Sequence, residues 1–111
     1  MNTTKKIRIF ATEADAAKAV PPGTLRKLKI GAYTLCLANT HQGFMAISDA
    51  CPHQLASLSG GTLNARLQVI CPLHQKSYSL ITGEEGSKRT PPAETFKVET
   101  TEEGIFVHIP A

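Results

Sequence analysis

A chain of 111 residues and 11.9 kDa has the size of one domain, and we predict a single domain over residues 1–111. The net charge of +3 comes from 12 basic and 9 acidic residues without a polybasic run, and aromatic residues make up only 5% of the chain. This composition argues against binding to nucleic acid or to an anionic membrane surface. No stretch approaches the ~20 apolar residues that span a bilayer, and no secretory signal opens the sequence. We therefore predict a soluble cytoplasmic protein.

The sequence alternates short strand patterns with turns. Apolar and polar side chains alternate on both sides of Gly31, which predicts two strands, and Pro21-Pro22-Gly23 ends a short helical pattern. In chain order we predict a strand at 7–10, a short helix at 11–20, strands at 25–30, 33–38, 44–47, 68–70 and 78–81, and a hairpin that pairs 95–100 with 105–109. Short strands at this spacing indicate an all-β fold, a sandwich or barrel of small antiparallel sheets.

The three cysteines are too few for a disulfide scaffold, and their odd number leaves one unpaired in any intramolecular pairing. In a reducing cytoplasm, thiols remain available as metal ligands. Cys36 falls in a predicted strand and is interpreted as a small core residue. The other two cysteines lie in turn-like segments, where a different role has to be considered.

Two loops combine cysteine with histidine. The first is Cys51-Pro52-His53, and after seventeen residues the second is Cys71-Pro72-Leu73-His74. Two thiolates and two imidazoles can hold iron or zinc, and each proline stiffens its loop. Zinc fingers generally pair Cys with Cys and His with His, whereas each loop here contributes one of each. This distribution favours a two-iron cluster.

The pattern C-x-H-x₁₇-C-x-x-H resembles the Rieske [2Fe–2S] fingerprint, and the resemblance extends from the strand before the first loop to the hairpin after Pro92. It implies a Rieske-type fold with a cluster-binding subdomain, formed by the two loops, at about 48–92. It also implies one [2Fe–2S] cluster, with Cys51 and Cys71 on the inner iron and His53 and His74 on the outer iron. His41 and His108 lie outside both loops and are not predicted as ligands.

By the same resemblance, residues 57–61 would form a tight turn whose N–H groups point to cluster sulfur. Pro91-Pro92 would cover the cluster, with Leu55 and Leu73 as apolar covers or core residues. The family has glycine at the positions of Leu55 and Gln75, so a positive φ there would cost strain.

The residues after the second histidine bear on the reduction potential. Membrane-complex Rieske proteins carry an additional disulfide, absent here because its positions hold Ala56 and Leu73. Their serine and tyrosine, which hydrogen-bond the cluster, correspond to Lys76 and Tyr78. Loss of the serine lowers the potential, which Tyr78 and the positive charge of Lys76 partly restore. We predict a potential in the lower part of the Rieske span of roughly −150 to +300 mV.

A closed cluster without a substrate site implies a one-electron carrier that is not an enzyme by itself. The resemblance to ferredoxins of multicomponent oxygenases implies a flavin-dependent reductase as electron donor and a terminal oxygenase as acceptor. Two alternatives stay open: a component like the small subunit of NAD(P)H nitrite reductase, and a zinc-stabilised interaction module. Lys76, Lys88 and Arg89 could also gather near the cluster and attract an acidic partner.

Overall fold

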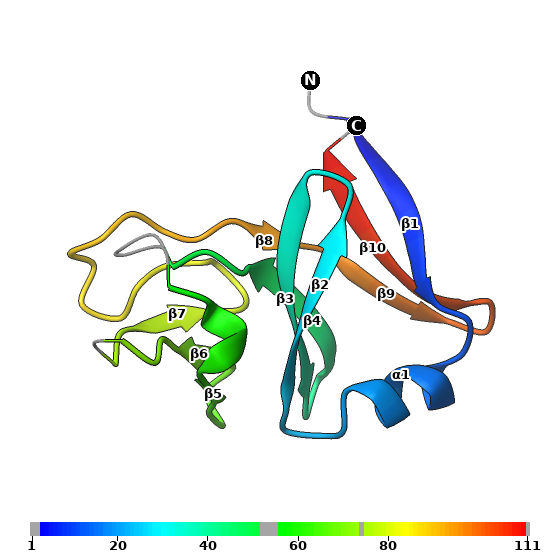
Figure 1. Ribbon diagram of the computed structural model, residues 1–111, viewed down its shortest axis with the longest axis horizontal. Helices are drawn as coiled ribbons and strands as arrows, with labels where there is room; N and C mark the ends of the chain where they lie inside the picture. Colours follow the sequence, from blue (N-terminus) through cyan, green and yellow to red (C-terminus); the bar gives the residue numbers. More distant parts are fainter. Residues whose placement is uncertain (1–2, 52–55, 74, 111) are drawn as a thin grey trace.

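The protein is represented by a computed structural model that describes residues 3–51, 56–73 and 75–110. Within these ranges the regular secondary structure is mostly β-strand, and the molecule has extents of 39 × 34 × 20 Å (Figure 1). The elements are β1 (Thr4–Phe10), α1 (Glu13–Ala19), β2 (Leu25–Ile30), β3 (Tyr33–Thr40), β4 (Gly43–Ser48), the 3-10 helix η1 (Leu58–Gly60), β5 (Thr62–Leu63), β6 (Gln68–Ile70), β7 (Ser77–Ser79), β8 (Thr95–Phe96), β9 (Val98–Thr101) and β10 (Gly104–Pro110).

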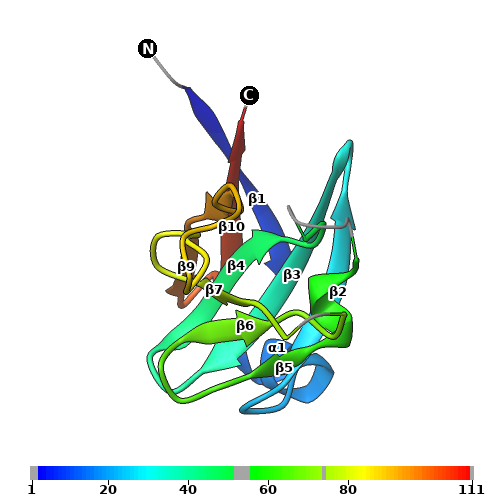
Figure 2. The ribbon, with the colours of Figure 1, turned by 90° about the vertical axis from the view of Figure 1, so that its left-hand side faces the viewer.

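The strands form three small antiparallel sheets, which confirms the predicted all-β class. Their orders are β1-β10-β9, β2-β3-β4-β8 and β5-β6-β7. In Figure 1 the small β5-β6-β7 sheet lies on the left and the β1-β10-β9 sheet on the right, with β2, β3 and β4 between them. Turned by 90°, the small sheet and the long connection after β7 face the viewer (Figure 2).

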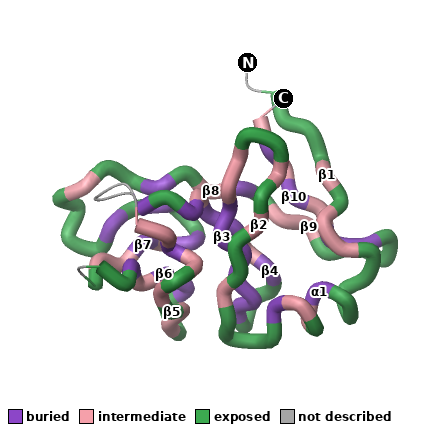
Figure 3. Tube along the Cα trace, viewed as in Figure 1, coloured by how far each residue is buried: buried purple, intermediate pink, exposed green. Residues whose placement is uncertain are grey.

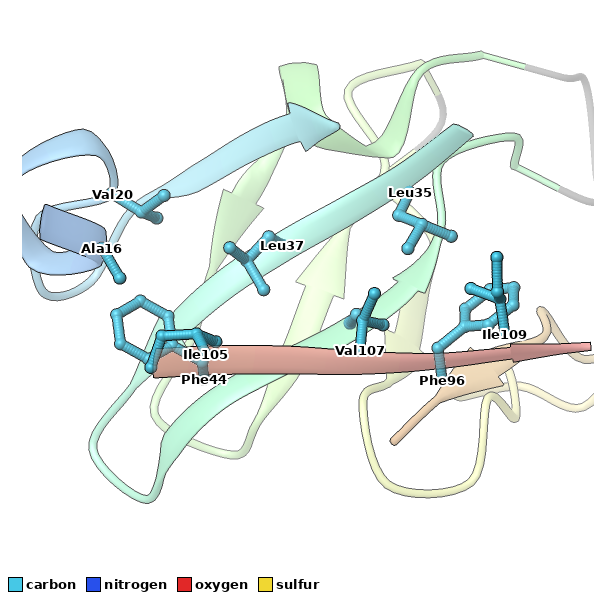
Figure 4. Packing of buried hydrophobic residues seen from close by; sticks show 10 residues of the cluster. Ala16, Val20, Leu35, Leu37, Phe44, Phe96, Ile105, Val107 and Ile109 are labelled. Atoms are coloured by element: carbon cyan, nitrogen blue, oxygen red, sulfur yellow. The ribbon is translucent and has the colours of Figure 1, made fainter. Parts of the chain in front are cut away.

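Strand β3 supplies both hydrophobic cores because its side chains alternate between two buried faces. Leu35 and Leu37 point to a core shared with β10 and α1, which Figure 4 shows from close by. Cys36 and Ala38 point to a second core against the small sheet. Residues 35–40 are all buried, as the tube in Figure 3 shows. The central strand therefore packs on one side against the first core and on the other against the small sheet beside the two loops, and Cys36 is a core residue as predicted.

The predicted helix at 11–20 is shorter in the structure, because Thr12 caps it. The Thr12 hydroxyl accepts the N–H of Asp15 at 3.0 Å, and α1 begins at Glu13. Only Ala16 of the helix is buried, against the first core.

The predicted hairpin of 95–100 with 105–109 is wrong in its first part. Phe96 pairs with Ala46 of β4, whereas Val98 pairs with Val107 of β10, so the chain changes sheets between them. Phe96 packs edge-on against Tyr33, with ring centroids 5.9 Å apart. Alternation predicts strands but does not identify the partner strand, which here is decided by the burial of Phe96 between the sheets. Within the described residues, no helix has the length and apolar character needed to cross a membrane.

Candidate metal centre

The two cysteine loops are closed in the same way. The N–H of Cys51 donates to the carbonyl of Ala56, and the N–H of Cys71 donates to the carbonyl of Lys76, both at 2.8 Å. In each case the acceptor lies five residues further along the chain. The second loop is also braced by the N–H of Gln75, which donates to the carbonyl of Cys71 at 3.1 Å. The two loops are thus closed by the same kind of backbone hydrogen bond, from the N–H of the cysteine to the carbonyl five residues later.

The structure brings the two predicted thiol ligands together in the second core. Cys51 and Cys71 are 0% and 2% exposed. Burial raises the pKa of the Cys71 thiol, the N–H of Leu73 donates to its sulfur and lowers it, and a hydrogen bond with Cys51 and the charge of that group raise it. Two adjacent buried thiols do not both ionise without a neighbouring cation, and a metal centre supplies that cation. This pair of sulfurs therefore fits a cluster that needs two thiolates.

The two predicted histidine ligands, His53 and His74, lie outside the described residues, as does Leu55. The other histidines lie elsewhere: His41 Nε2 is 3.2 Å from the carbonyl of Ala65, and His108 is hydrogen-bonded to Glu99. In the described part of the chain, no three or more His, Cys, Asp or Glu side chains gather in a way that could hold a metal ion.

Tyr78 contacts the first thiol directly. Its hydroxyl oxygen lies 3.4 Å from Cys51 Sγ and 3.2 Å from Thr90 Oγ1, and the side chain is fully buried. Burial, above all, and the hydrogen bond with Cys51 raise the pKa of Tyr78 to about 12. The phenol is thus protonated at neutral pH and can donate to a thiolate, as predicted from the sequence.

A buried carboxylate holds the base of the first loop. Asp49 is 4% exposed; it accepts the Ser57 hydroxyl at 2.6 Å and the Ser59 N–H at 2.8 Å. Burial acts to raise the pKa of Asp49, but these hydrogen bonds and the charge of Lys27, 3.6 Å away, outweigh it and the pKa lies below its ordinary value. Asp49 is therefore ionised at neutral pH and fixes the chain on both sides of Cys51.

Residues 57–61 form the predicted tight turn, but the N–H groups of residues 58–61 do not point to sulfur. Those of residues 58–61 donate to the oxygens of Asp49, Ser57 and Leu58. The turn packs closely against the second loop, since a Cβ on Gly61 would come within 1.8 Å of the carbonyl oxygen of Ile70. Glycine at this position lets the two loops approach each other.

A second buried carboxylate, Glu85, stands beside the second loop. Hydrogen bonds from the hydroxyl and the N–H of Ser87 lower the pKa of Glu85 to about 2, with a further contribution from Lys76, whose Nζ is 3.8 Å away. The charge of Lys76 is thus compensated, so the expectation that it raises the potential is not supported. Lys88 likewise pairs with Glu84 at 3.7 Å, which weakens the idea of a free basic patch.

Three further expectations concern the loop backbone and its cover. Gln75 has a φ of +57°, so the strain anticipated for a side chain at this glycine position is present. Leu73 is 45% exposed and is therefore not a core residue. Pro91 and Pro92 are exposed, and the residue before them, Thr90, reaches Tyr78.

Sequence reasoning missed the roles of Asp49, Glu85 and Thr90. The sequence contains little indication of these roles for the two acids. Asp49 is bound by Ser57 and Ser59 and Glu85 by Ser87, and serines spaced in this way are common in ordinary turns. Thr90 had no signal, since its partner lies twelve residues earlier in the chain.

The fold and the site together define a small all-β protein in which two loops bring two buried thiols into one core. The family model described as the Rieske [2Fe–2S] domain matches residues 11–102. Ferredoxin CarAc of Metapseudomonas resinovorans is 36% identical over 94 residues, which cover 83% of this chain and 87% of the relative. The chain therefore belongs to the Rieske [2Fe–2S] domain family, whose cofactor is one [2Fe–2S] cluster.

Two solved structures extend the comparison. One is a chain of the complex of reduced oxygenase and oxidized ferredoxin in carbazole 1,9a-dioxygenase. It is 33% identical, with a TM-score of 0.75 over 91% of this chain and 99% of that chain. The other is a putative NADH-dependent nitrite reductase small subunit from Mycobacterium tuberculosis. It has a TM-score of 0.83 over 99% of both chains but only 18% identity, so it shows the fold alone.

Proposed function

We propose that this protein carries single electrons, through one [2Fe–2S] cluster, from a flavin-dependent reductase to the terminal oxygenase of a bacterial dioxygenase system. It is an electron-transfer component and not a catalyst by itself. The observation that carries the proposal is the buried pair of thiols, Cys51 and Cys71, presented by two loops with equivalent backbone closure. The 33% identical ferredoxin solved with its oxygenase supports the choice of acceptor.

Four residues are proposed as ligands: Cys51 and Cys71 on the inner iron, and His53 and His74 on the outer iron. The burial of both sulfurs supports their assignment to the inner iron. Both histidines stand one or two positions beyond a loop proline, in the spacing of the family fingerprint. When bound, the cluster takes up and releases one electron without binding substrate.

We further propose that residues 1–111 form one domain and that it works in the cytoplasm. Strand β3 supplies buried residues to both cores, and this shared strand supports a single domain. A reducing compartment keeps the two ligand thiols from forming disulfides, which supports the location.

The proposal is tested with protein purified under anaerobic conditions. We expect about two irons and two sulfides per chain and a rhombic EPR signal in the reduced state. We also expect reduction by a flavin-dependent reductase with NADH and reoxidation by a dioxygenase oxygenase. The variants His53→Ala and His74→Ala should lose this signal. A native signal in both variants would contradict the histidine assignment.

The two alternatives give different results in the same preparation. A colourless protein with stoichiometric zinc would establish the interaction module and end the proposal. A protein that carries the cluster but exchanges electrons only with a sirohaem nitrite reductase would favour the nitrite reductase component. The nitrite reductase structure shows the fold alone, so the choice depends on this assay.

A further inference from the structure

We propose that Thr90 is a positioning residue for the redox centre: its hydroxyl donates to Tyr78 and holds the phenol hydroxyl on the sulfur of Cys51. The inference rests on the proposed function, because it concerns the state in which Cys51 is a thiolate ligand. In this proposal the loop that carries Thr90, just before Pro91-Pro92, helps to set the reduction potential of the cluster.

The direction of the hydrogen bonds follows from donor and acceptor counting. Tyr78 Oη lies between Cys51 Sγ, at 3.4 Å, and Thr90 Oγ1, at 3.2 Å. In the structure the Cys51 thiol donates to the Tyr78 oxygen. As a cluster ligand Cys51 is a thiolate that only accepts, and a phenol has one proton, so Tyr78 then donates that proton to the sulfur. The Thr90 hydroxyl then has to be the donor to the tyrosine oxygen. A chain of two hydrogen bonds polarises its members and strengthens the one that ends on sulfur.

The backbone around Thr90 is fixed at the base of its loop. The N–H of Ala93 donates to the carbonyl of Gly83 at 2.8 Å, which closes the segment 84–92. A Cβ on Gly83 would come within 1.9 Å of the carbonyl oxygen of Ala93, so the two ends of the loop are in close backbone contact. Pro91 restricts the residue before it to extended backbone, which removes much of the freedom of Thr90.

The interior of the same loop is held by the buried carboxylate of Glu85. It accepts the hydroxyl and the N–H of Ser87 and the N–H of Arg89, the last at 3.3 Å. Glu85 also lies against Tyr78, since the two residues form an isolated β-bridge. One anion thus fixes the loop that carries Thr90 on the strand that carries Tyr78.

The test measures midpoint potentials of the cluster-loaded protein in a double-mutant cycle. Thr90→Val keeps the shape and removes the hydroxyl, and Thr90→Ala is a second variant that removes it. Thr90→Ser restores it. Tyr78→Phe removes the phenol hydroxyl, and Thr100→Val, at an exposed site in β9, is the matched control.

We expect Tyr78→Phe to lower the potential, because the hydrogen bond on sulfur stabilises the reduced cluster. Thr90→Val should lower it by about 10–30% of that shift, the strengthening that one hydrogen bond gives the next. In the Tyr78→Phe background, Thr90→Val should have no further effect, Thr90→Ser should stay near wild type, and Thr100→Val should not change the potential.

The outcomes separate the inference from the proposed function. A wild-type protein without a rhombic EPR signal would refute the function. With that signal present and a shift for Tyr78→Phe, an unchanged potential in both Thr90→Val and Thr90→Ala would overturn the inference alone. An equal Thr90→Val shift in both tyrosine and phenylalanine backgrounds would also overturn it, since the effect would then not pass through the phenol.

Discussion

Gln75 is in a conformation that favours glycine, and its replacement by glycine should stabilise the protein. Its φ of +57° places it in the left-handed region, which costs an L-residue about 1–2 kcal/mol. Glycine removes that cost. However, the greater conformational freedom of glycine in the unfolded chain lowers the stability of the folded protein by about 0.4–1 kcal/mol. The side chain is exposed and the N–H bond to Cys71 is kept by glycine, so little else changes. We expect a net gain of about 0.5–1 kcal/mol for Gln75→Gly.

This gain converts to a melting temperature through the entropy of unfolding. At about 2.1 cal/mol/K per residue, a chain of this length unfolds with about 230 cal/mol/K, so the expected increase is about 2–4 °C. Thermal unfolding of the cluster-loaded protein is followed by circular dichroism at one heating rate. The EPR spectrum is recorded to verify that the cluster is unchanged.

Two other residues with positive φ provide controls. Lys88, at +60°, is exposed, so Lys88→Gly should also raise the melting temperature, less the small contribution of its surface ion pair with Glu84. Leu67, at +60°, is 5% exposed, so Leu67→Gly should be destabilising because lost burial of about 2–3 kcal/mol exceeds the relief of strain. A lower melting temperature for Gln75→Gly would refute the reasoning from backbone strain.

Further predictions concern Tyr78, Asp49 and Gly61. Tyr78→Phe should lower the midpoint potential in voltammetry without loss of the cluster, and an unchanged potential would exclude the hydrogen bond to sulfur. Asp49→Asn should destabilise the protein at pH 7 by about 1.5–3 kcal/mol, the range for hydrogen bonds to a charged group. The folded pKa of Asp49 is lowered, so its stabilising effect is present above the ordinary pKa and disappears as pH falls through the folded value. The difference between variant and wild type, measured by urea unfolding, should therefore shrink as the pH falls below the ordinary pKa of aspartate, and a constant difference would contradict this. Gly61→Ala should prevent normal folding because its Cβ would overlap the carbonyl oxygen of Ile70, whereas Gly60→Ala should be tolerated; equal melting temperatures would show that the loops do not approach as described.

The sequence was sufficient for the all-β class and for the two cysteine loops because both depend on local patterns. Alternation identified strands β2, β3 and β6 within about two residues, and proline and glycine identified the turns. Alternation did not identify the partner of each strand. The change of partner after Phe96, from β4 to β10, was therefore missed. Pairing is decided by burial between sheets, which no short window of sequence contains.

The site was predicted in the same uneven way. Cys51 and Cys71 follow from their spacing, and their meeting in one core is what that spacing implies. The supporting polar groups do not follow from spacing. Glu85 looked like a solvated turn residue, and only the fold shows that it is 3% exposed and accepts three hydrogen bonds. A charge becomes buried when its partners surround it, and those partners depend on tertiary structure.

The distribution of charge near the two loops determines how readily the centre accepts an electron. Reduction adds a negative charge, which buried anions oppose and nearby cations favour. Asp49 and Glu85 are 4% and 3% exposed and ionised, whereas the side chains of their partners Lys27 and Lys76 are 55% and 23% exposed. Because solvent screens an exposed charge more than a buried one, each pair leaves a net negative charge beside its loop. The charge of Glu85 acts on Tyr78, whose hydroxyl contacts Cys51. The hydrogen bond from Tyr78 is one opposing contribution. We therefore expect a midpoint potential in the lower part of the Rieske span, and voltammetry that placed it in the upper half would refute this balance of charges.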